Sequence, residues 1–331
     1  MVHFNYSMER KHLSLIILPA FLVGFFVLYY FFKATIPPII SSDDLFHPTN
    51  NESPRDALVR NMTPTFDEKF DTFSRYLDTT GNVICNPGGK GVWQTVYHFC
   101  SRTSPANLEA EVYIDQNFID YLNSTTDIHT TAVSPFSITN GILSIEAKPA
   151  DRPIVTAVGS WAGYTSGLIT TQFSFSQLYG YFEIRAKLPP GRGVWPAFWL
   201  LPTDKDWPPE IDVFETFGDT SVNGEGGRTH IRHASHALKN GESCGEWHDV
   251  GVDITTDFHT YGVDWEADHI TYYFDGKPYA ICPPNSAANT PFYILINLAV
   301  GGKGSWPGTP DKTNVWPVHM DVDYVKVYQR K

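Results

Sequence analysis

The stretch 181–188 alternates apolar and charged side chains in two-residue steps. Side chains of a strand point alternately to opposite faces, so its apolar residues are expected to face a core and Glu183, Arg185 and Lys187 to face outward. Residues 270–281 predict a hairpin that turns at Asp275-Gly276. Further strands are predicted at 292–300 and 320–328. With Gly- and Pro-rich turns and no βαβ alternation, this pattern indicates an all-β, antiparallel sandwich.

The segment 210–215, Glu-Ile-Asp-Val-Phe-Glu, places three carboxyl groups among apolar side chains with no Lys or Arg between them. In a regular strand Glu210 and Asp212 point to one face and Glu215 to the other. One extra residue at Val213-Phe214, a β-bulge, would return Glu215 to the face of Glu210. Converging carboxyl groups hold their protons unequally, as acid/base and nucleophilic catalysis requires. The segment therefore predicts an active site, and the alternative is an acidic, solvated strand face.

The N-terminal region contains an uncharged apolar stretch at 13–32. About 20 apolar residues cross a bilayer as a helix, and no small-residue cleavage site follows. We therefore expect one transmembrane signal anchor over 13–33. The positive charges of Arg10 and Lys11 place residues 1–12 in the cytoplasm. Residues 34–63 are expected to form a flexible tether. Residues 64–331 would then form a domain on the extracytoplasmic side of the cell membrane, periplasmic or extracellular.

Composition narrows the class of ligand. A 15% aromatic share, with nine Trp and seventeen Tyr, suits sugar recognition, although most rings are expected to fill the core. The net charge of −12 argues against a nucleic-acid partner. The four cysteines are too widely spaced for a zinc knuckle. Proximity in sequence favours the disulfides Cys85–Cys100 and Cys244–Cys282, with free buried thiols as the alternative.

Six segments, in order along the chain, are similar to glycoside hydrolase family 16: 179–188, 194–201, 210–215, 258–265, 297–302 and 322–328. The resemblance runs from about residue 65 to the C-terminus. It implies a concanavalin-like β-jelly-roll sandwich of two antiparallel sheets, in which the concave sheet forms a glycan cleft. It also implies an endo-acting β-glycanase for β-1,3- or mixed β-1,3/1,4-glucan or a related exopolysaccharide. The chain most resembles the bacterial laminarinase, lichenase and exopolysaccharide-glycanase branches.

The resemblance assigns Glu210 as nucleophile, Glu215 as acid/base and Asp212 as the helper between them. A retaining glycosidase needs two such carboxyl groups about 5–5.5 Å apart. Glu210 is expected to be ionised, whereas burial and nearby negative charge should raise the pKa of Glu215. The expected outcome is net retention of anomeric configuration, with no cofactor required.

Other residues are weaker candidates for binding the substrate. Trp195, Trp199 and Trp207 are expected as aromatic platforms, and the first two also fit a core. The resemblance implies that Asn297 and Trp306 line the cleft. Three histidines, at 230, 233 and 236, lie too far out of phase on a strand to share a metal ion. Of these, His230 is the predicted substrate contact, although a Gly-rich insertion at 222–228 departs from the family pattern.

Some members of the family hold a structural calcium ion on the convex side, and Glu109 and Asp323 are the candidate ligands here. Two acids fall well short of the 6–8 oxygens that calcium takes. The chain is expected to be a monomer. Two alternatives to hydrolysis stay open: a transglycosylase on the same fold, and a membrane-tethered glycan-binding module without catalysis. The intact set of three acids disfavours the second.

Overall fold

The computed structural model describes residues 52–97, 100–116, 134–152, 154–155, 162–204, 207–221, 223–238 and 241–331. The expected cytoplasmic segment 1–12 and membrane anchor 13–33 lie outside these residues. Within the described ranges, no helix is both long enough and apolar enough to span a bilayer.

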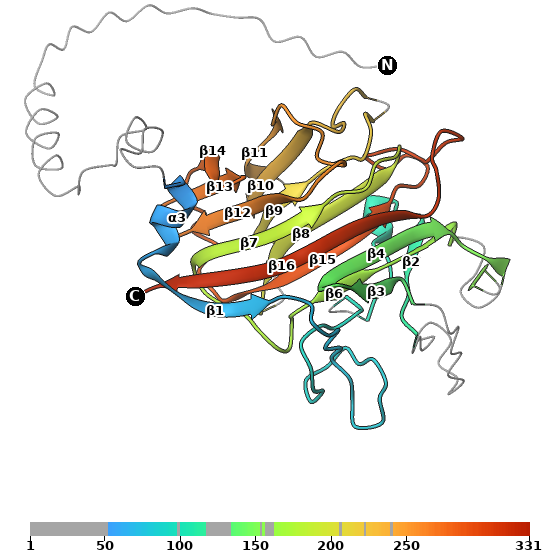
Figure 1. Ribbon diagram of the computed structural model, residues 1–331, viewed down its shortest axis with the longest axis horizontal. Helices are drawn as coiled ribbons and strands as arrows, with labels where there is room; N and C mark the ends of the chain where they lie inside the picture. The colour runs from blue at the N-terminus through green and yellow to red at the C-terminus, as the bar shows by residue number, and fades with distance from the viewer. Residues whose placement is uncertain are drawn as a thin grey trace, which may run out of the picture. The chain divides into compact units, whose positions relative to one another are not determined.

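The larger sheet has ten strands (Figure 1). Its main path runs β14-β13-β12-β7-β16-β4-β5-β2. Two further strands lie off this path: β1 pairs with the C-terminal part of β16, and β3 pairs with β4. All its pairs are antiparallel except β2 with β5. The strands are β1 (Met62–Glu68), β2 (Glu111–Tyr113), β3 (Phe136–Thr139), β4 (Ile142–Pro149), β5 (Tyr164–Ser166), β7 (Gly180–Lys187), β12 (His259–Trp265), β13 (Ile270–Phe274), β14 (Lys277–Cys282) and β16 (Val318–Arg330).

The second sheet has six antiparallel strands in the order β11-β10-β9-β8-β15-β6. They are β6 (Leu168–Thr170), β8 (Val194–Pro202), β9 (Glu210–Glu215), β10 (His230–Leu238), β11 (Gly241–Asp249) and β15 (Phe292–Val300). One core of buried apolar side chains, contributed by both sheets, fills the space between them. The predicted all-β sandwich is therefore correct.

The hairpin predicted from the sequence is present. Strands β13 and β14 pair through Phe274 and Lys277. The two turn residues, Asp275 and Gly276, have φ of +46° and +73°. Positive φ at both central residues of a two-residue hairpin favours Asp-Gly, because glycine meets no Cβ penalty there.

Strand β7 confirms the predicted alternation at its apolar positions but corrects one charged position. Its inward residues Phe182, Ile184 and Ala186 are fully buried. Glu183 was expected to face solvent, yet only 1% of its side chain is exposed. It points to the outer face of the ten-stranded sheet, where Arg55 donates to its two carboxylate oxygens at 2.8 and 2.9 Å.

Arg55 belongs to helix α3 (Pro54–Val59), which the sequence did not predict. Ser53 caps this helix by accepting the Asp56 N–H at 3.1 Å. Strand β1 then begins at Met62, which pairs with Arg330 of β16. The expected tether over 34–63 is thus too long at its C-terminal end, because residues from Pro54 onward already pack on the domain.

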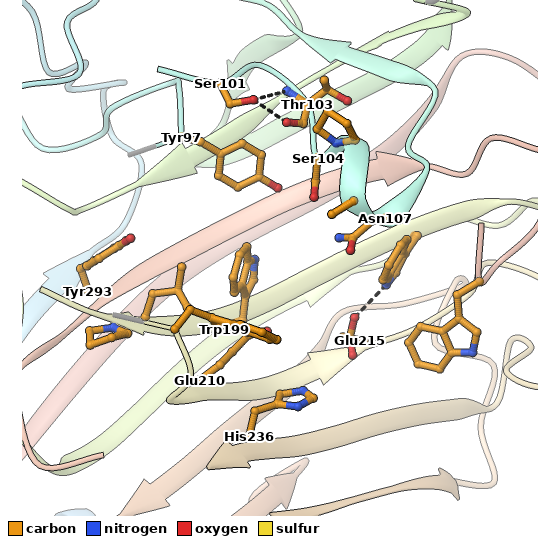
Figure 2. A pocket seen from close by; sticks show the side chains of 17 residues that line it. Tyr97, Ser101, Thr103, Ser104, Asn107, Trp199, Glu210, Glu215, His236 and Tyr293 are labelled. Carbon is orange, nitrogen blue, oxygen red and sulfur yellow. Dashed lines mark hydrogen bonds between the residues drawn. The ribbon is translucent and has the colours of Figure 1, made fainter. Parts of the chain in front are cut away.

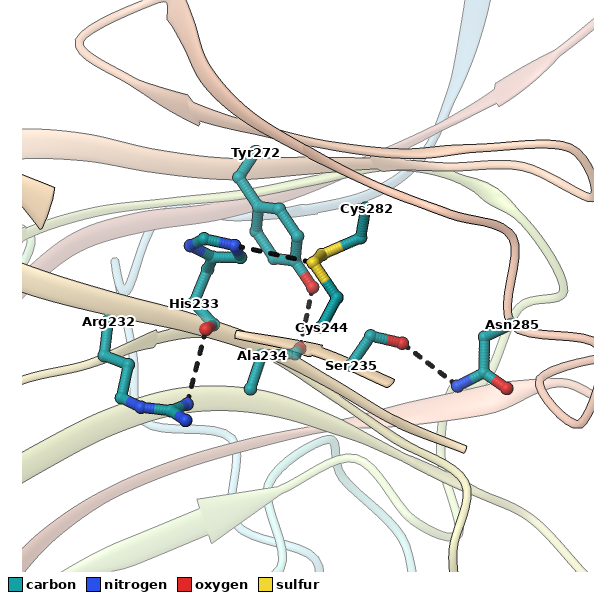
Figure 3. Close-up of a disulfide and its surroundings, with 8 residues drawn as sticks. All are labelled: Arg232, His233, Ala234, Ser235, Cys244, Tyr272, Cys282 and Asn285. Atoms are coloured by element: carbon teal, nitrogen blue, oxygen red, sulfur yellow. Dashed lines mark hydrogen bonds between the residues drawn. A yellow bond between two sulfur atoms is a disulfide. The ribbon is translucent and has the colours of Figure 1, made fainter. Parts of the chain in front are cut away.

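Two disulfides join Cys85 to Cys100 and Cys244 to Cys282, with Cα–Cα distances of 5.4 and 5.7 Å. They are the pairs favoured by sequence proximity. The second links β11 to β14, which are edge strands of the two different sheets. Figure 3 shows it beside the buried imidazole of His233.

Candidate active site

The acidic segment forms β9, and the predicted bulge is present in it. Neighbouring residues of β8, Phe198 and Trp199, pair with Phe214 and Asp212, so β9 contains one extra residue at Val213. The pairing of β9 with β10 shifts at the same place. The extra residue restores the phase, so Glu210 and Glu215 both point into one cleft, on the outer face of the six-stranded sheet.

The cleft has a volume of about 610 Å³ and is lined by both glutamates and by several aromatic rings. In Figure 2, Glu210, Glu215 and His236 lie on one side of it, and Tyr97, Ser104 and Asn107 face them from the other. A concave, mostly apolar cleft with a few converging polar groups is typical of a small-molecule or glycan site.

Glu210, Asp212 and His236 lie close together at the cleft. Trp207 donates its indole N–H to Glu210 at 2.6 Å, and His236 Nε2 lies 3.1 Å from Asp212 Oδ2. Burial and then the charge of Asp212 raise the pKa of Glu210, and burial and then the charge of Glu215 raise the pKa of Asp212. A hydrogen bond joins the two carboxyl groups, so one proton on the pair leaves the other group anionic.

Glu215 has a different environment. Burial raises its pKa to about 7, the positive charge of Arg232 opposes that rise, and the charge of Glu210 adds to it. Trp195 donates its indole N–H to Glu215 at 3.0 Å. Arg232 is paired directly with Glu215 across β10 and β9, and its guanidinium lies 5.3 Å from the ring centre of Trp306. Glu215 can therefore hold a proton near neutral pH, as a general acid must.

The four tryptophans predicted to bind substrate, Trp195, Trp199, Trp207 and Trp306, all line this cleft. Trp207 is 54% exposed and next to Glu210, so its ring is open to a ligand. Trp195 is 8% exposed and Trp306 packs against its ring at 5.7 Å, so part of each indole also serves the packing of the cleft floor.

Asn297 is 5% exposed and does not line the cleft. Its side-chain oxygen accepts the indole N–H of Trp199 at 2.8 Å, and its amide donates to Tyr113 at 3.0 Å. Asn297, which the resemblance placed in the cleft wall, therefore lies one layer behind that wall.

Among the histidines, the structure brings a different one to the cleft than the sequence favoured. His230 does not line it, and its Nδ1 lies 3.0 Å from the hydroxyl of Thr229. His236 does line it, because it pairs directly with Glu210 across β10 and β9. His233 faces the opposite side, next to Tyr272. Knowing that β9 and β10 are neighbours in register would have identified His236.

No sequence feature points to the wall opposite the acids. It consists of Tyr97, Ser101, Thr103, Ser104, Pro105, Ala106 and Asn107, and Leu201, Pro202 and Tyr293 add to one end of the cleft. These residues carry no motif of their own, since a loop gives no periodic signal. Only their position in the fold assigns them to the site.

The two acids expected as calcium ligands each have other partners. Asp323 forms an ion pair with Arg185. Glu109 instead accepts the backbone N–H of Ser104 at 2.9 Å and hydrogen-bonds Glu111. Among the described residues, the His/Cys/Asp/Glu groups whose ligand atoms cluster include neither Glu109 nor Asp323. The two acids occupy separate environments, each with partners of its own.

A two-layer β-sandwich with buried carboxyl groups of unequal pKa in a tryptophan-lined cleft has the features of a glycosidase. Residues 115–326 match the glycosyl hydrolases family 16, and the chain belongs to that family. This confirms the resemblance seen in the six sequence segments.

Two relatives and one solved structure show the extent of the similarity. An endo-1,3-1,4-beta-glycanase of Rhizobium meliloti is 36% identical over 270 residues, which cover 81% of this chain and 52% of that protein. A glucan endo-1,3-beta-glucosidase of Niallia circulans is 34% identical over 263 residues, 72% of this chain and 38% of that protein. The catalytic domain of a Thermotoga petrophila laminarinase superposes with a TM-score of 0.61 at 27% identity, covering 82% of this chain and 98% of that one. The chain spans about half the length of the Rhizobium meliloti relative.

Proposed function

We propose that this chain is an endo-acting, retaining β-glycanase that hydrolyses β-1,3- or mixed β-1,3/1,4-glucan or a related exopolysaccharide. The observation that carries the proposal is the bulge at Val213, because it turns Glu215 into the cleft that Glu210 already faces. The pKa of about 7 at Glu215 supports its role as the acid, and a proton held by the neighbouring Asp212 would leave Glu210 as the attacking anion. The names of the relatives in Rhizobium meliloti and Niallia circulans support the choice of substrate.

In the proposed first step, protonated Glu215 gives its proton to the glycosidic oxygen while the Glu210 carboxylate attacks the anomeric carbon. The glycosidic bond breaks and a glycosyl ester of Glu210 forms. Trp207 and Asp212 hydrogen-bond Glu210 and hold its oxygens in place. In the second step, the Glu215 carboxylate takes a proton from water, the water oxygen bonds to the anomeric carbon, and Glu210 leaves as a carboxylate.

The test is to incubate the full chain, in detergent, with laminarin, lichenan, agarose and succinoglycan and to measure new reducing ends. We expect cleavage of laminarin or lichenan by the native protein. Glu210→Gln and Glu215→Gln should each lower turnover by about 100- to 10,000-fold with an unchanged circular dichroism spectrum. Binding to these polymers without cleavage would instead support a glycan-binding module. Longer products formed with an added acceptor sugar would support a transglycosylase.

Stereochemistry gives a second test of the mechanism. Proton NMR of the first products should show the β-anomer before mutarotation sets in, because two successive displacements at one carbon restore its configuration. First appearance of the α-anomer would refute the double displacement and leave the assignment to the family intact.

We further propose that residues 13–33 anchor the protein to the cell membrane and that the domain acts as a monomer outside the cytoplasm without a metal cofactor. The apolar stretch supports the anchor. Extraction from membranes by detergent but not by high salt would agree with it, and release by salt alone would refute it. Activity should survive EDTA, and its loss would point to a required cation.

A further inference from the structure

Glu109 is a half-buried carboxylate beside the cleft that the proposed catalytic steps do not use. It accepts two hydrogen bonds from the cleft's facing wall, defined here as residues 101–107. The donors are the backbone N–H of Ser104, at 2.9 Å, and the side-chain amide of Asn107, at 3.1 Å. Both donors belong to residues that line the cleft. Glu109 thus holds this wall from behind.

The same carboxylate is connected to the opposite side of the cleft. The Tyr113 hydroxyl lies 3.5 Å from Glu109 Oε2 and accepts a hydrogen bond from the Asn297 amide at 3.0 Å. Asn297 in turn accepts the indole N–H of Trp199 at 2.8 Å. The path therefore runs from a loop that forms one wall to an aromatic ring in the other, through three polar side chains.

The base of this network is anchored firmly. Glu111 is fully buried, accepts the Val300 N–H at 2.7 Å and shares a hydrogen bond with Glu109. Backbone hydrogen bonds from Ala110 to Val300, at 2.8 Å, and from Gly302 to Leu108, at 2.9 Å, tie the same segment to the end of β15. These hydrogen bonds hold the segment that carries Glu109 and Glu111 against the end of β15.

We propose that Glu109 is a positioning residue for substrate specificity: through Tyr113 and Asn297 it holds the Trp199 ring and the facing wall at a spacing that admits a β-linked pyranose ring. The substrate class rests on the proposed function. Tyr97 strengthens the assignment, because its ring is in edge contact with both Tyr113, at 5.5 Å, and Trp199, at 6.4 Å. These groups do not touch the reacting bond, so they affect binding rather than bond cleavage.

The experiment uses Tyr113→Phe, which removes the central hydroxyl and keeps the ring. We expect KM for laminarin to rise roughly tenfold, the size of one lost hydrogen bond in a buried network, with kcat within about twofold. Tyr261→Phe is the matched control, because its buried hydroxyl has no hydrogen-bond partner among the described residues. It should leave both constants unchanged. An unchanged KM in Tyr113→Phe, or a fall in kcat alone, would overturn the proposal.

A double-mutant cycle with Trp199→Phe tests the route. If Tyr113 acts through the Trp199 indole, the two changes should cost clearly less together than the sum of their separate effects on KM. Full additivity would show that the two residues act independently and would refute the path.

Affinity electrophoresis separates this inference from the proposed function. In a Glu210→Gln background, Tyr113→Phe should weaken the retardation of the protein by laminarin roughly tenfold in dissociation constant. If the native protein is retarded but cleaves nothing, the proposed hydrolysis fails, and this ratio still decides whether the Tyr113 hydroxyl links Glu109 to the substrate cleft. Retardation that is equal with and without the hydroxyl contradicts the positioning role.

Discussion

At the scale of single residues, the site depends on Glu210 and Glu215, five positions apart, which line the same cleft but have different neighbours. Glu210 is bound by Trp207 and Asp212, whereas Glu215 is bound by Trp195 and faces Arg232 across the sheet. Burial raises both pKa values, and the positive charge of Arg232 limits the rise at Glu215. In the proposed mechanism, Asp212 holds the proton of its pair with Glu210 so that Glu210 can attack, and Glu215 keeps the proton that it gives to the glycosidic oxygen.

The pKa of Glu215 predicts the alkaline side of the pH profile. Its protonated form is the one needed for the first step, and burial raises its pKa to about 7. As pH rises through about 7 that form is lost, so kcat/KM should fall by a factor approaching ten per pH unit. Initial rates on laminarin, measured from about pH 4 to about pH 10, would check this. A profile that stays level to well above pH 8, about one unit past the transition, would contradict the assignment.

Changing Arg232 should move that limit. Arg232→Met removes the positive charge that opposes protonation of Glu215, so the pKa should rise and the alkaline limb should shift to higher pH. Arg232→Lys keeps the charge and is the control. Its activity should fall over nearly the same alkaline pH range as that of the native protein. Equal limbs in all three proteins would show that Arg232 has no electrostatic effect on Glu215.

At the scale of elements, the bulge in β9 is the feature that makes the site. Deleting Val213 should remove the bulge and leave Glu215 an even number of residues from Glu210, so regular alternation still points both side chains into the cleft. We expect the deletion variant to cleave laminarin far faster than Glu215→Gln, measured as new reducing ends. Val213→Ala keeps the residue count and should retain most of the activity, although it loses some packing. A folded deletion variant as inactive as Glu215→Gln would show that strand phase does not position Glu215.

Strands with regular alternation could be predicted from the sequence, and so could the hairpin at Asp275 and the bulge, because each has a local signature. The buried position of Glu183 could not, since its partner Arg55 lies 128 residues away. For the same reason His236 was passed over in favour of His230, as only the pairing of β10 with β9 reveals its place. The facing wall carries no pattern at all and depends on long-range contacts.

At the scale of the whole molecule, α3 joins the start of the folded region to the outer face of the ten-stranded sheet. Its Arg55 is 18% exposed and pairs with Glu183, which also accepts hydrogen bonds from Tyr181 and Tyr324 at 2.8 and 3.0 Å. The four groups form one buried polar cluster around a single carboxylate, and a carboxylate buried without its cation is costly.

Removing Arg55 should therefore destabilise the fold. Arg55→Met leaves Glu183 buried without its cation, and we expect the free energy of unfolding to fall by about 3–5 kcal/mol in urea titrations. Arg60→Met is the control from the residue that ends the same helix, because its ion pair with Glu52 is largely exposed and should contribute at most about 1 kcal/mol. Similar losses in the two variants would contradict the importance of burial.

The attachment of α3 has a practical consequence for how the enzyme can be held. Glu183 points away from the core on one sheet, whereas the catalytic groove opens on the far side of the other. A protein immobilised on beads through the residues just before Ser53 would present its groove outward. Long polysaccharides should then reach it without meeting the support.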